Sequence, residues 1–359
     1  MDRAKDAESE LECFNLFMDP SIIADMTVRT NKRIYSLLES FTPAKRAKMK
    51  TKNKYAVETC DEEVKAYLGL AFLRGYFQWN YWSAKKVWKS HPLFPATMTL
   101  NRFVYINRHI TLDEIDTREE RWKLDRFTAV REIFERFNEN CGTALQMGEY
   151  GAIDECQYAT MMQVSFKTYN PSKPAKYGIL FKCINEVKMP FTHRSEPFAG
   201  KPSVESGEYY LGTTEAITLR LIDKVAEKQD MQGRNISMDN LYTSIPPCQQ
   251  LLDRGMTLVG TMRHNRVGLP KEVKSLEGRE TFSTQVWWEK EKQKMTLTSY
   301  VVPTKSKGMK NVVVLSSQQP ILGVTMDDEK YKPQIIKFYD FSKGTFVFDD
   351  CKYPAAHNL

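Results

Sequence analysis

Two aspartates, each expected at the end of an apolar stretch, are the residues best suited to chemistry in this sequence. Asp154 follows one apolar segment and precedes Glu155, and Asp239 follows a second and precedes Asn240. Acids at the carboxyl ends of neighbouring strands point into the crevice where α/β domains place their sites. Carboxylate oxygens suit Mg²⁺ or Mn²⁺, and substrate phosphates usually complete the coordination of these ions. The pair therefore predicts a metal site formed by Asp154 and Asp239.

A site that cleaves phosphodiesters with two metal ions needs more than this pair. Two ions ~3.5–4 Å apart activate the attacking oxygen and stabilise the leaving oxygen, and two acids bridge them poorly. A third carboxylate is therefore expected. On spacing alone, an ordinary role for both aspartates as turn residues or helix caps stays open.

Basic residues form two groups away from these acids. The run of lysines and arginines between Lys45 and Lys54 contains no carboxylate. Such a run is typical of a solvated linker, a phosphate-binding segment or a nuclear-import signal. Arg263 and Arg266 follow the strand after Asp239, and they are candidates to line a DNA groove. The alternative is that they are solvated residues of an exposed loop.

The segments that must position these residues change character at Gly148. Before it, apolar residues recur at helical spacing, and one helix is expected from about Phe127 to Cys141. After it, strands and helices alternate, which indicates an α/β layer domain. Residues 281–317 favour β-hairpins, and QIIKFYD (334–340) favours a further strand.

Composition excludes several classes of protein. The 359 residues carry a formal net charge of +7, with 42% apolar and 27% charged residues, a profile typical of a globular protein. No apolar stretch is long enough to cross a membrane, and the charged N-terminus has no signal-peptide core. The seven cysteines include no CxxC pair. We therefore expect no disulfide framework, no zinc ribbon and a cytosolic or nuclear location.

Four segments together resemble the piggyBac transposase family. They are IDECQYATMMQVSFKTYNPSKPAKYGILFK (153–182), MDNLYTSIPPCQQLL (238–252), TLVGTMRHNRVGLPKEV (257–273) and QIIKFYDFSKG (334–344). The resemblance implies an α/β fold in which an RNase H-like catalytic domain contains a β-rich insertion and follows an all-helical domain. It also implies DNA cutting and joining by three metal-binding aspartates, with Mg²⁺ or Mn²⁺ as cofactor. Asp154 matches the first aspartate and Asp239 the second.

The same resemblance implies the division of the chain and its partners. The expected parts are a helical and basic segment (1–58), a helical DNA-binding and dimerisation domain (59–148), the first part of the RNase H-like domain (149–263), a β-rich insertion (264–332), and a return strand with a truncated end (333–359). DNA and a second copy of the chain are the expected partners. The expected location is the nucleus, with no membrane contact.

The block that should supply the third aspartate departs from the family pattern. The family has KGG followed closely by two aspartates, whereas this chain reads KGTFVFDD from Lys343 to Asp350. Without a gap Val347 occupies the catalytic place, and with one deletion Phe346 does. Asp350 then takes the place of the accompanying acid in the first register and Asp349 in the second, so Asp349, the provisional third ligand, can serve only if the loop slips by a residue or more. One residue of extended chain spans ~3.3 Å, whereas metal–ligand distances hold to ~0.2 Å.

Two further departures concern DNA and zinc. The stretch after Asp154 is neutral through residues 159–162, where relatives commonly carry polar or basic residues, which weakens the expected grip on phosphates. The remaining candidates for DNA contact there are Lys167, Lys173 and Lys176. The chain also ends without the family's cysteine-rich zinc-binding domain, so we expect no zinc in it.

These observations lead to three hypotheses, in order of preference. The first is a transposase-derived protein that keeps DNA binding and the catalytic scaffold, with catalysis impaired. The second is an active metal-dependent transposase in which Asp349 or Asp350 supplies the third carboxylate. The third is a non-enzymatic interaction protein adopted by the host, in which the fold serves as a dimerising module.

Overall fold

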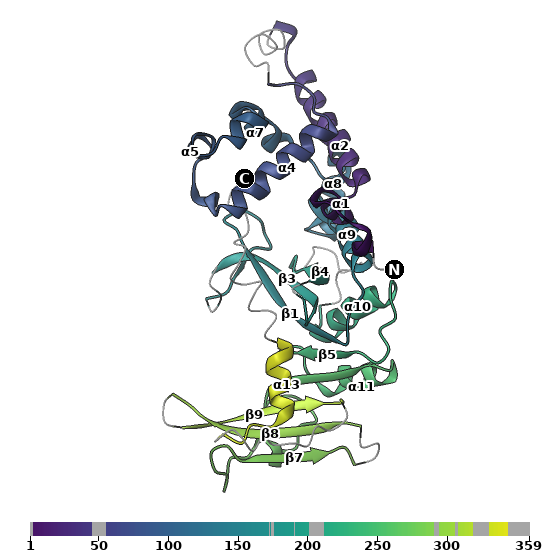
Figure 1. Cartoon of the computed structure of the whole chain (residues 1–359), viewed down its shortest axis with the longest axis vertical. Helices are drawn as coiled ribbons and strands as arrows, with labels where there is room; N and C mark the ends of the chain where they lie inside the picture. Colours follow the sequence, from purple (N-terminus) through teal and green to yellow (C-terminus); the bar gives the residue numbers. More distant parts are fainter. Residues whose placement is uncertain are drawn as a thin grey trace.

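The protein has a helical half above a single twisted sheet, as Figure 1 shows. The computed structural model describes residues 3–44, 55–171, 173, 176–189, 191–200, 212–290, 294–305, 308–318 and 330–343. The basic run from Lys45 to Lys54 and the candidate acids Asp349 and Asp350 lie outside these residues.

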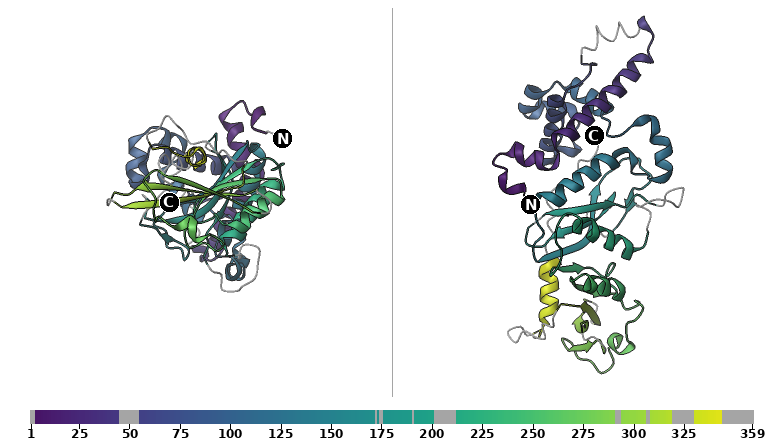
Figure 2. Two further views of the ribbon diagram at one scale, coloured as in Figure 1. Left: turned by 90° about the horizontal axis from the view of Figure 1, so that it is seen from below. Right: turned by 90° about the vertical axis from the view of Figure 1, so that its right-hand side faces the viewer.

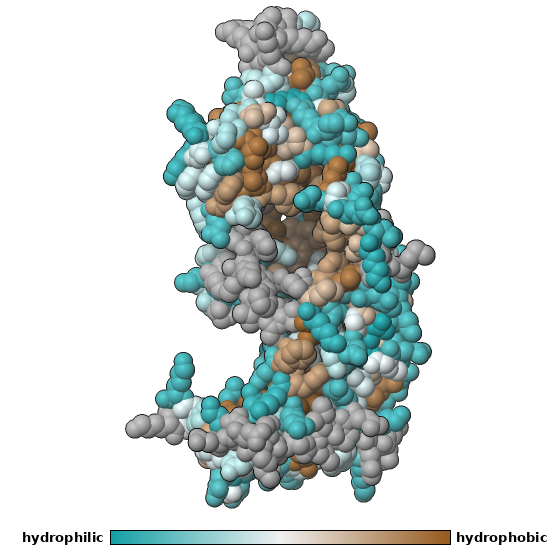
Figure 3. Space-filling view, in the orientation of Figure 1, coloured by the Kyte–Doolittle hydropathy of each residue, from teal (hydrophilic) through white to brown (hydrophobic). Residues whose placement is uncertain are grey.

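Helices account for the regular structure up to Ala144. They are η1 (Arg3–Asp6), α1 (Glu10–Phe17), α2 (Pro20–Glu39), α4 (Asp61–Tyr76), η2 (Trp79–Tyr81), α5 (Ala84–Ser90), α6 (Leu93–Thr97), α7 (Leu100–His109), η3 (Ile115–Thr117), α8 (Arg118–Leu124) and α9 (Thr128–Ala144). The helix predicted from Phe127 to Cys141 is therefore confirmed as α9. In the view of Figure 3, apolar residues gather over this helical half, and Phe72 of α4 is 62% exposed.

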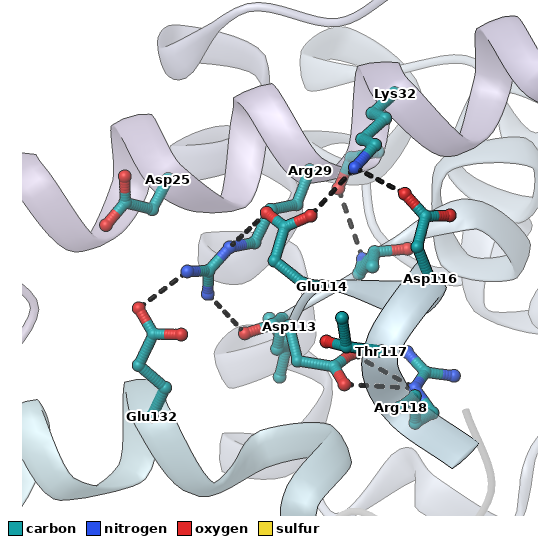
Figure 4. A network of polar contacts seen from close by, with 12 residues as sticks. Asp25, Arg29, Lys32, Asp113, Glu114, Asp116, Thr117, Arg118 and Glu132 are labelled. Atoms are coloured by element: carbon teal, nitrogen blue, oxygen red, sulfur yellow. Dashed lines mark hydrogen bonds and ion pairs between the residues drawn. The ribbon is translucent and has the colours of Figure 1, made fainter. Parts of the chain in front are cut away.

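Charged side chains fasten α2 to the rest of the helical half (Figure 4). The guanidinium of Arg29 donates to the Leu112 carbonyl at 2.7 Å and pairs with Glu132 of α9 at 2.5 Å. The ammonium of Lys32 pairs with Glu114 at 2.8 Å. These contacts join segments about 80 to 100 residues apart in sequence, which local helix propensity cannot do.

A second network, centred on Arg102 of α7, holds the chain that enters α4. Its guanidinium pairs with the Glu63 carboxylate, and it donates to the carbonyls of Tyr55, Val57 and Glu58 at 2.7 Å each. The side chain of Arg102 is only 9% exposed. Because a buried cation must be paired to be tolerated, this fork specifies how α7 and α4 meet.

Within the described residues, nine strands form one mixed sheet. The strands are β1 (Tyr150–Ala159), β2 (Thr168–Tyr169), β3 (Tyr177–Glu186), β4 (Thr192–Pro197), β5 (Asn235–Met238), β6 (Thr257–Met262), β7 (Thr284–Trp288), β8 (Thr296–Pro303) and β9 (Met309–Ser316). Their order is β2-β3-β1-β5-β6-β9-β8-β7, and β4 pairs with β3. Strands β1, β5 and β6 are parallel, and β3 runs antiparallel to β1.

The segment expected as a β-rich insertion extends this sheet directly. Strand β9 pairs with β6, and β8 and β7 follow outward as antiparallel neighbours. The predicted hairpins of residues 281–317 are therefore confirmed. Their hydrogen bonds continue the ladder that contains the aspartates, so this segment and the central strands share one sheet.

Helices cover both faces of the sheet. Helices α10 (Thr214–Ala226) and α11 (Ile245–Asp253) pack on one face around Leu221, Ile236, Leu251 and Leu258. Helix α13 (Gln334–Lys343) packs on the other face, where Figure 2 shows it in yellow. The short helix α12 (Lys271–Lys274) contacts β8 and β9.

The prediction of a return strand at 334–340 is wrong, because this segment is the helix α13. Its buried residues are Ile335, Ile336, Tyr339 and Ser342, which recur at the spacing of one helix face. The adjacent isoleucines suggest a strand when read alone. Tyr339, one turn later, packs with them against Val259 and Val314, and Ser342, a further turn on, hydrogen-bonds to Ser237.

Candidate functional site

The parallel pairing of β1 with β5 brings Asp154 and Asp239 together. The paired residues run from Tyr150 with Asn235 to Ile153 with Met238, and the two aspartates come next on their strands. Asp154 does not end its strand as the sequence suggested, because β1 continues to Ala159 along β3. What ends at Ile153 is the parallel ladder, since β5 stops at Met238 while β1 runs on.

One oxygen of each carboxylate is held by the backbone. Oδ1 of Asp154 accepts a hydrogen bond from the Glu155 N–H at 2.8 Å, and Oδ1 of Asp239 accepts one from the Leu241 N–H at 2.8 Å. The carbonyl of Asp239 also accepts from the Thr243 hydroxyl at 2.7 Å. Both carboxylates are thereby oriented before any ligand binds. The other oxygen, Oδ2, points toward Lys343 in each case.

The two Oδ2 atoms share one cationic neighbour, Lys343, at the last described position of α13. Its Nζ lies 3.8 Å from Oδ2 of Asp154 and 3.9 Å from Oδ2 of Asp239. The acid side chains are 18% and 23% exposed, and that of Lys343 is 36% exposed. The Lys343 ammonium therefore lies close to both acids, beside the carboxyl end of β5.

The electrostatics of the three groups follow from this arrangement. Burial raises the pKa of Asp154, with Lys343 acting against it and Asp239 adding to it. Burial acts to lower the pKa of Lys343, but the charges of Asp154, Tyr339 and Asp239 outweigh it, so that pKa is raised. Lys343 consequently stays protonated, and it offsets part of the repulsion between the two carboxylates.

Helix α13 is pinned to the sheet beside the acids. The Ser237 hydroxyl of β5 donates to the Ser342 hydroxyl at 2.6 Å, and both side chains are buried. The hydroxyls of Thr261 and Tyr339 lie 3.3 Å apart. These contacts fix the end of α13 relative to β5 and β6, and therefore fix where the Lys343 side chain starts.

Glu155 faces the opposite side of the sheet from Asp154, because neighbouring strand residues alternate. The Tyr242 hydroxyl donates to Oε1 of Glu155 at 3.4 Å. Lys182, its cross-strand neighbour, is buried and lies 5.6 Å from the centre of the Tyr242 ring. Burial raises the pKa of Glu155, partly opposed by the charge of Lys182. Glu155 is therefore half-buried on the other face of β1, beside Tyr242 and Lys182, and the charges of Asp239 and Asp154 also raise its pKa.

The basic residues named from the sequence differ in how near they lie to the acids. Nζ of Lys173 donates to the Glu155 carbonyl at 3.3 Å, so Lys173 lies beside Asp154. Lys167 lies over the Tyr177 ring at 5.8 Å, and Lys176 is exposed. Of the three lysines named from the sequence, Lys173 is thus the one that these contacts place beside Asp154.

Arg263 and Arg266 serve the loop that carries Asp239. Nε of Arg263 donates to Oδ1 of Asn240 at 2.9 Å, and Nη2 of Arg266 donates to the carbonyls of Asn240, at 3.2 Å, and Leu241. The loop after β6 is therefore tied to the loop after β5. Arg263 remains exposed as well, so it combines this contact with access to solvent.

The chemistry of these donors fits one hard divalent cation. Two carboxylate oxygens converge on a point where Lys343 already places a positive charge, and oxygen ligands of this kind suit Mg²⁺ or Mn²⁺. In the part of the chain that the structure describes, no group of three or more His, Cys, Asp or Glu residues could hold a metal ion. The provisional third ligand, Asp349, lies outside that part.

Comparisons with known proteins agree with this fold. The family described as Transposase IS4, which includes piggyBac-type enzymes, matches residues 9–352. The chain belongs to this family. Its fold is also similar to the cryo-EM structure of a piggyBac transposase synaptic complex with hairpin DNA. That likeness has a TM-score of 0.84 and 23% identity, and covers 100% of this chain and 71% of the other. A search of curated proteins finds no match.

These findings confirm the recognition and the fold class expected for a piggyBac-type transposase. The mixed sheet with helices on both faces is the predicted RNase H-like α/β fold. No helix among the described residues is long and apolar enough to cross a membrane.

Sequence reasoning missed Lys343 as a member of the site in this transposase-family protein. The lysine was visible at the start of the KGTFVFDD block, but its segment was interpreted as a strand. The signal that could have found it is the helical spacing of Ile335, Tyr339 and Ser342. Read as a helix, 334–343 places its final turn beside the carboxyl end of β5.

Proposed function

We propose that this protein binds DNA on a piggyBac-type transposase scaffold and holds a divalent cation between Asp154 and Asp239, with DNA cleavage and strand transfer impaired. The observation that supports it is the convergence of two free Oδ2 atoms on one cationic point, while both Oδ1 atoms are held by backbone N–H groups. Such preorganised acids are what a metal-dependent phosphodiester site requires.

The residues of the chain have separate roles in this proposal. Asp154 and Asp239 hold Mg²⁺ or Mn²⁺, which when bound supplies a Lewis acid for a phosphate oxygen. Lys167, Lys173 and Lys176 contact backbone phosphates of DNA. Arg263 and Arg266 position the Asp239 loop, and the exposed Arg263 also faces DNA.

We propose that catalysis is impaired because the position of the third metal ligand does not hold an aspartate. The family's third aspartate aligns with Val347 without a gap, and the described residues supply two acids rather than three. Within the described residues two carboxylates are available to a cation, whereas a two-metal site needs ligands for both ions. We further propose a nuclear location and assembly as a homodimer, as expected for this family.

The deciding experiment combines DNA binding with plasmid nicking. Fluorescence anisotropy on a duplex between 50 and 200 mM salt should show affinity that falls steeply and linearly on logarithmic axes. Lys176→Ala should reduce the slope by about 1, because it removes one phosphate contact. Lys337→Ala, an exposed lysine of α13, is the matched control and should leave the slope unchanged.

Incubation of supercoiled plasmid with Mn²⁺ then tests catalysis, and no nicking above background is expected. Nicking that is lost in Asp154→Asn but kept in Asp340→Asn would show an active enzyme and overturn the proposed impairment. Asp340 is an apt control because it is an exposed acid on the same helix as Lys343. A stable dimer without DNA binding near physiological salt would instead favour the dimerising module.

A further inference from the structure

The acid pair has a positive partner built into the chain. Nζ of Lys343 lies almost equally far from Oδ2 of Asp154 and of Asp239, at 3.8 and 3.9 Å. These are the same two oxygens that the backbone leaves free. The ammonium therefore lies where a cation shared by the two acids would be attracted.

The position of Lys343 depends on the packing of α13 and not on its side chain alone. The preceding residue, Ser342, is fully buried and hydrogen-bonded to Ser237 of β5. One turn earlier, Tyr339 is buried and contacts Thr261 of β6, and its ring centre lies 5.8 Å from Nζ of Lys343. Two anchors on neighbouring strands thus hold the helix end over the acids.

We propose that Lys343 is an internal counter-ion of the acid pair, which keeps the carboxylates together without metal and which a divalent cation must displace. This inference rests on the proposed function, in which Asp154 and Asp239 hold the cation. An ion bound ~2.1 Å from both oxygens would lie within a few ångströms of the ammonium, and like charges at that distance repel. Metal and lysine therefore compete for one place.

Competition has two measurable consequences. Without metal, removal of the ammonium leaves two partly buried carboxylates facing each other, so the apo protein loses stability. With metal, the same change removes a competing charge, so the divalent ion binds more tightly. A fully exposed lysine would produce neither effect, because exposed ion pairs contribute little to stability.

The test compares Lys343→Met with Lys337→Met, a matched control at an exposed lysine six residues earlier on α13. In EDTA, Lys343→Met should lower the Tm by ~2–4 °C, and Lys337→Met should not change it. Isothermal titration calorimetry with Mn²⁺ should show about tenfold tighter binding to Lys343→Met, which corresponds to ~1.4 kcal/mol. Lys343→Gln provides a second neutral variant, should the first fold poorly.

Three outcomes would overturn the proposal or part of it. Unchanged Tm in EDTA for both neutral variants would remove the counter-ion role. Mn²⁺ affinity in Lys343→Met equal to that in Lys337→Met would remove the competition. If no protein in the series binds Mn²⁺, the proposed cation site itself fails, and the EDTA measurement still decides independently whether Lys343 neutralises the acids.

Discussion

Substitution of Gly260 by alanine should disturb the site from a strand that carries no acid. Gly260 of β6 is paired with Met238 of β5, the residue before Asp239. A Cβ at this position would lie 2.1 Å from the Thr243 hydroxyl oxygen and 2.6 Å from the Met238 carbonyl oxygen. Neither atom can yield easily, because one is backbone and the other is fully buried.

The expected cost has two parts. Overpacking of a dense interior costs about 1–3 kcal/mol. The displaced Thr243 hydroxyl also loses its hydrogen bonds to the carbonyls of Met238, at 3.2 Å, and Asp239, at 2.7 Å, and one such bond contributes roughly 1 kcal/mol. Together these effects predict a loss of roughly 2–4 kcal/mol, and the Asp239 loop should move with its hydroxyl anchor.

Thermal unfolding in EDTA measures the first consequence, and a fall in Tm of at least ~4 °C is expected for Gly260→Ala. The gain in Tm on addition of Mn²⁺ measures the displacement of the Asp239 loop. This gain should be smaller in Gly260→Ala, because the Asp239 carboxylate is moved away from that of Asp154. Gly69→Ala is the control, because Gly69 lies in the interior of α4 with nothing near its added Cβ. It should gain about 0.5–1 kcal/mol instead. A Gly260→Ala protein as stable as the wild type would refute the packing argument.

Two other substitutions test the architecture around the site. Arg102→Met should lower the free energy of unfolding by roughly 3 kcal/mol or more, because it leaves Glu63 and three backbone carbonyls without their partner. The urea midpoint should fall accordingly, and an unchanged midpoint would show that these contacts are dispensable. Burial and the charge of Arg234 lower the pKa of His193 to about 4, so the unfolded chain takes up a proton there first as the pH falls. Stability should therefore decrease from about pH 6.5 to about pH 4, by up to roughly 3 kcal/mol. His193→Phe should flatten that part of the Tm–pH curve, and a profile identical to the wild type would contradict the assigned shift.

Much of the α/β half could be predicted from local patterns. The segment TLVGTM is β6 without a residue of difference, and the alternating stretch 281–317 forms β7, β8 and β9. The expectation that Asp154 and Asp239 lie on neighbouring strands also agrees with the structure, although β1 continues past Asp154 to Ala159. The two acids become neighbours because β1 and β5 are paired in parallel up to Ile153 and Met238, the residues that precede them.

Other features could not be predicted because they depend on contacts between distant segments. The two adjacent isoleucines of α13 suit a strand or a helix, and the choice is made by the apolar surface of β6 and β9 on which they pack. Arg263 and Arg266 look like free DNA contacts in sequence, yet they hydrogen-bond to the loop after β5. Side chains that long find their partners only after the strands are paired.

The sequence by itself determined helix α9, strand β6, the hairpin strands of 281–317 and the place of the two acids after apolar segments, because hydrophobic periodicity is a local property of the chain. Only the tertiary structure decided that the ammonium of Lys343 lies beside both acids. Lys343 reaches them because α13 is anchored through Ser342 and Tyr339 to strands about 100 and 80 residues earlier. The energy of that anchoring comes from long-range packing, which no window of neighbouring residues contains.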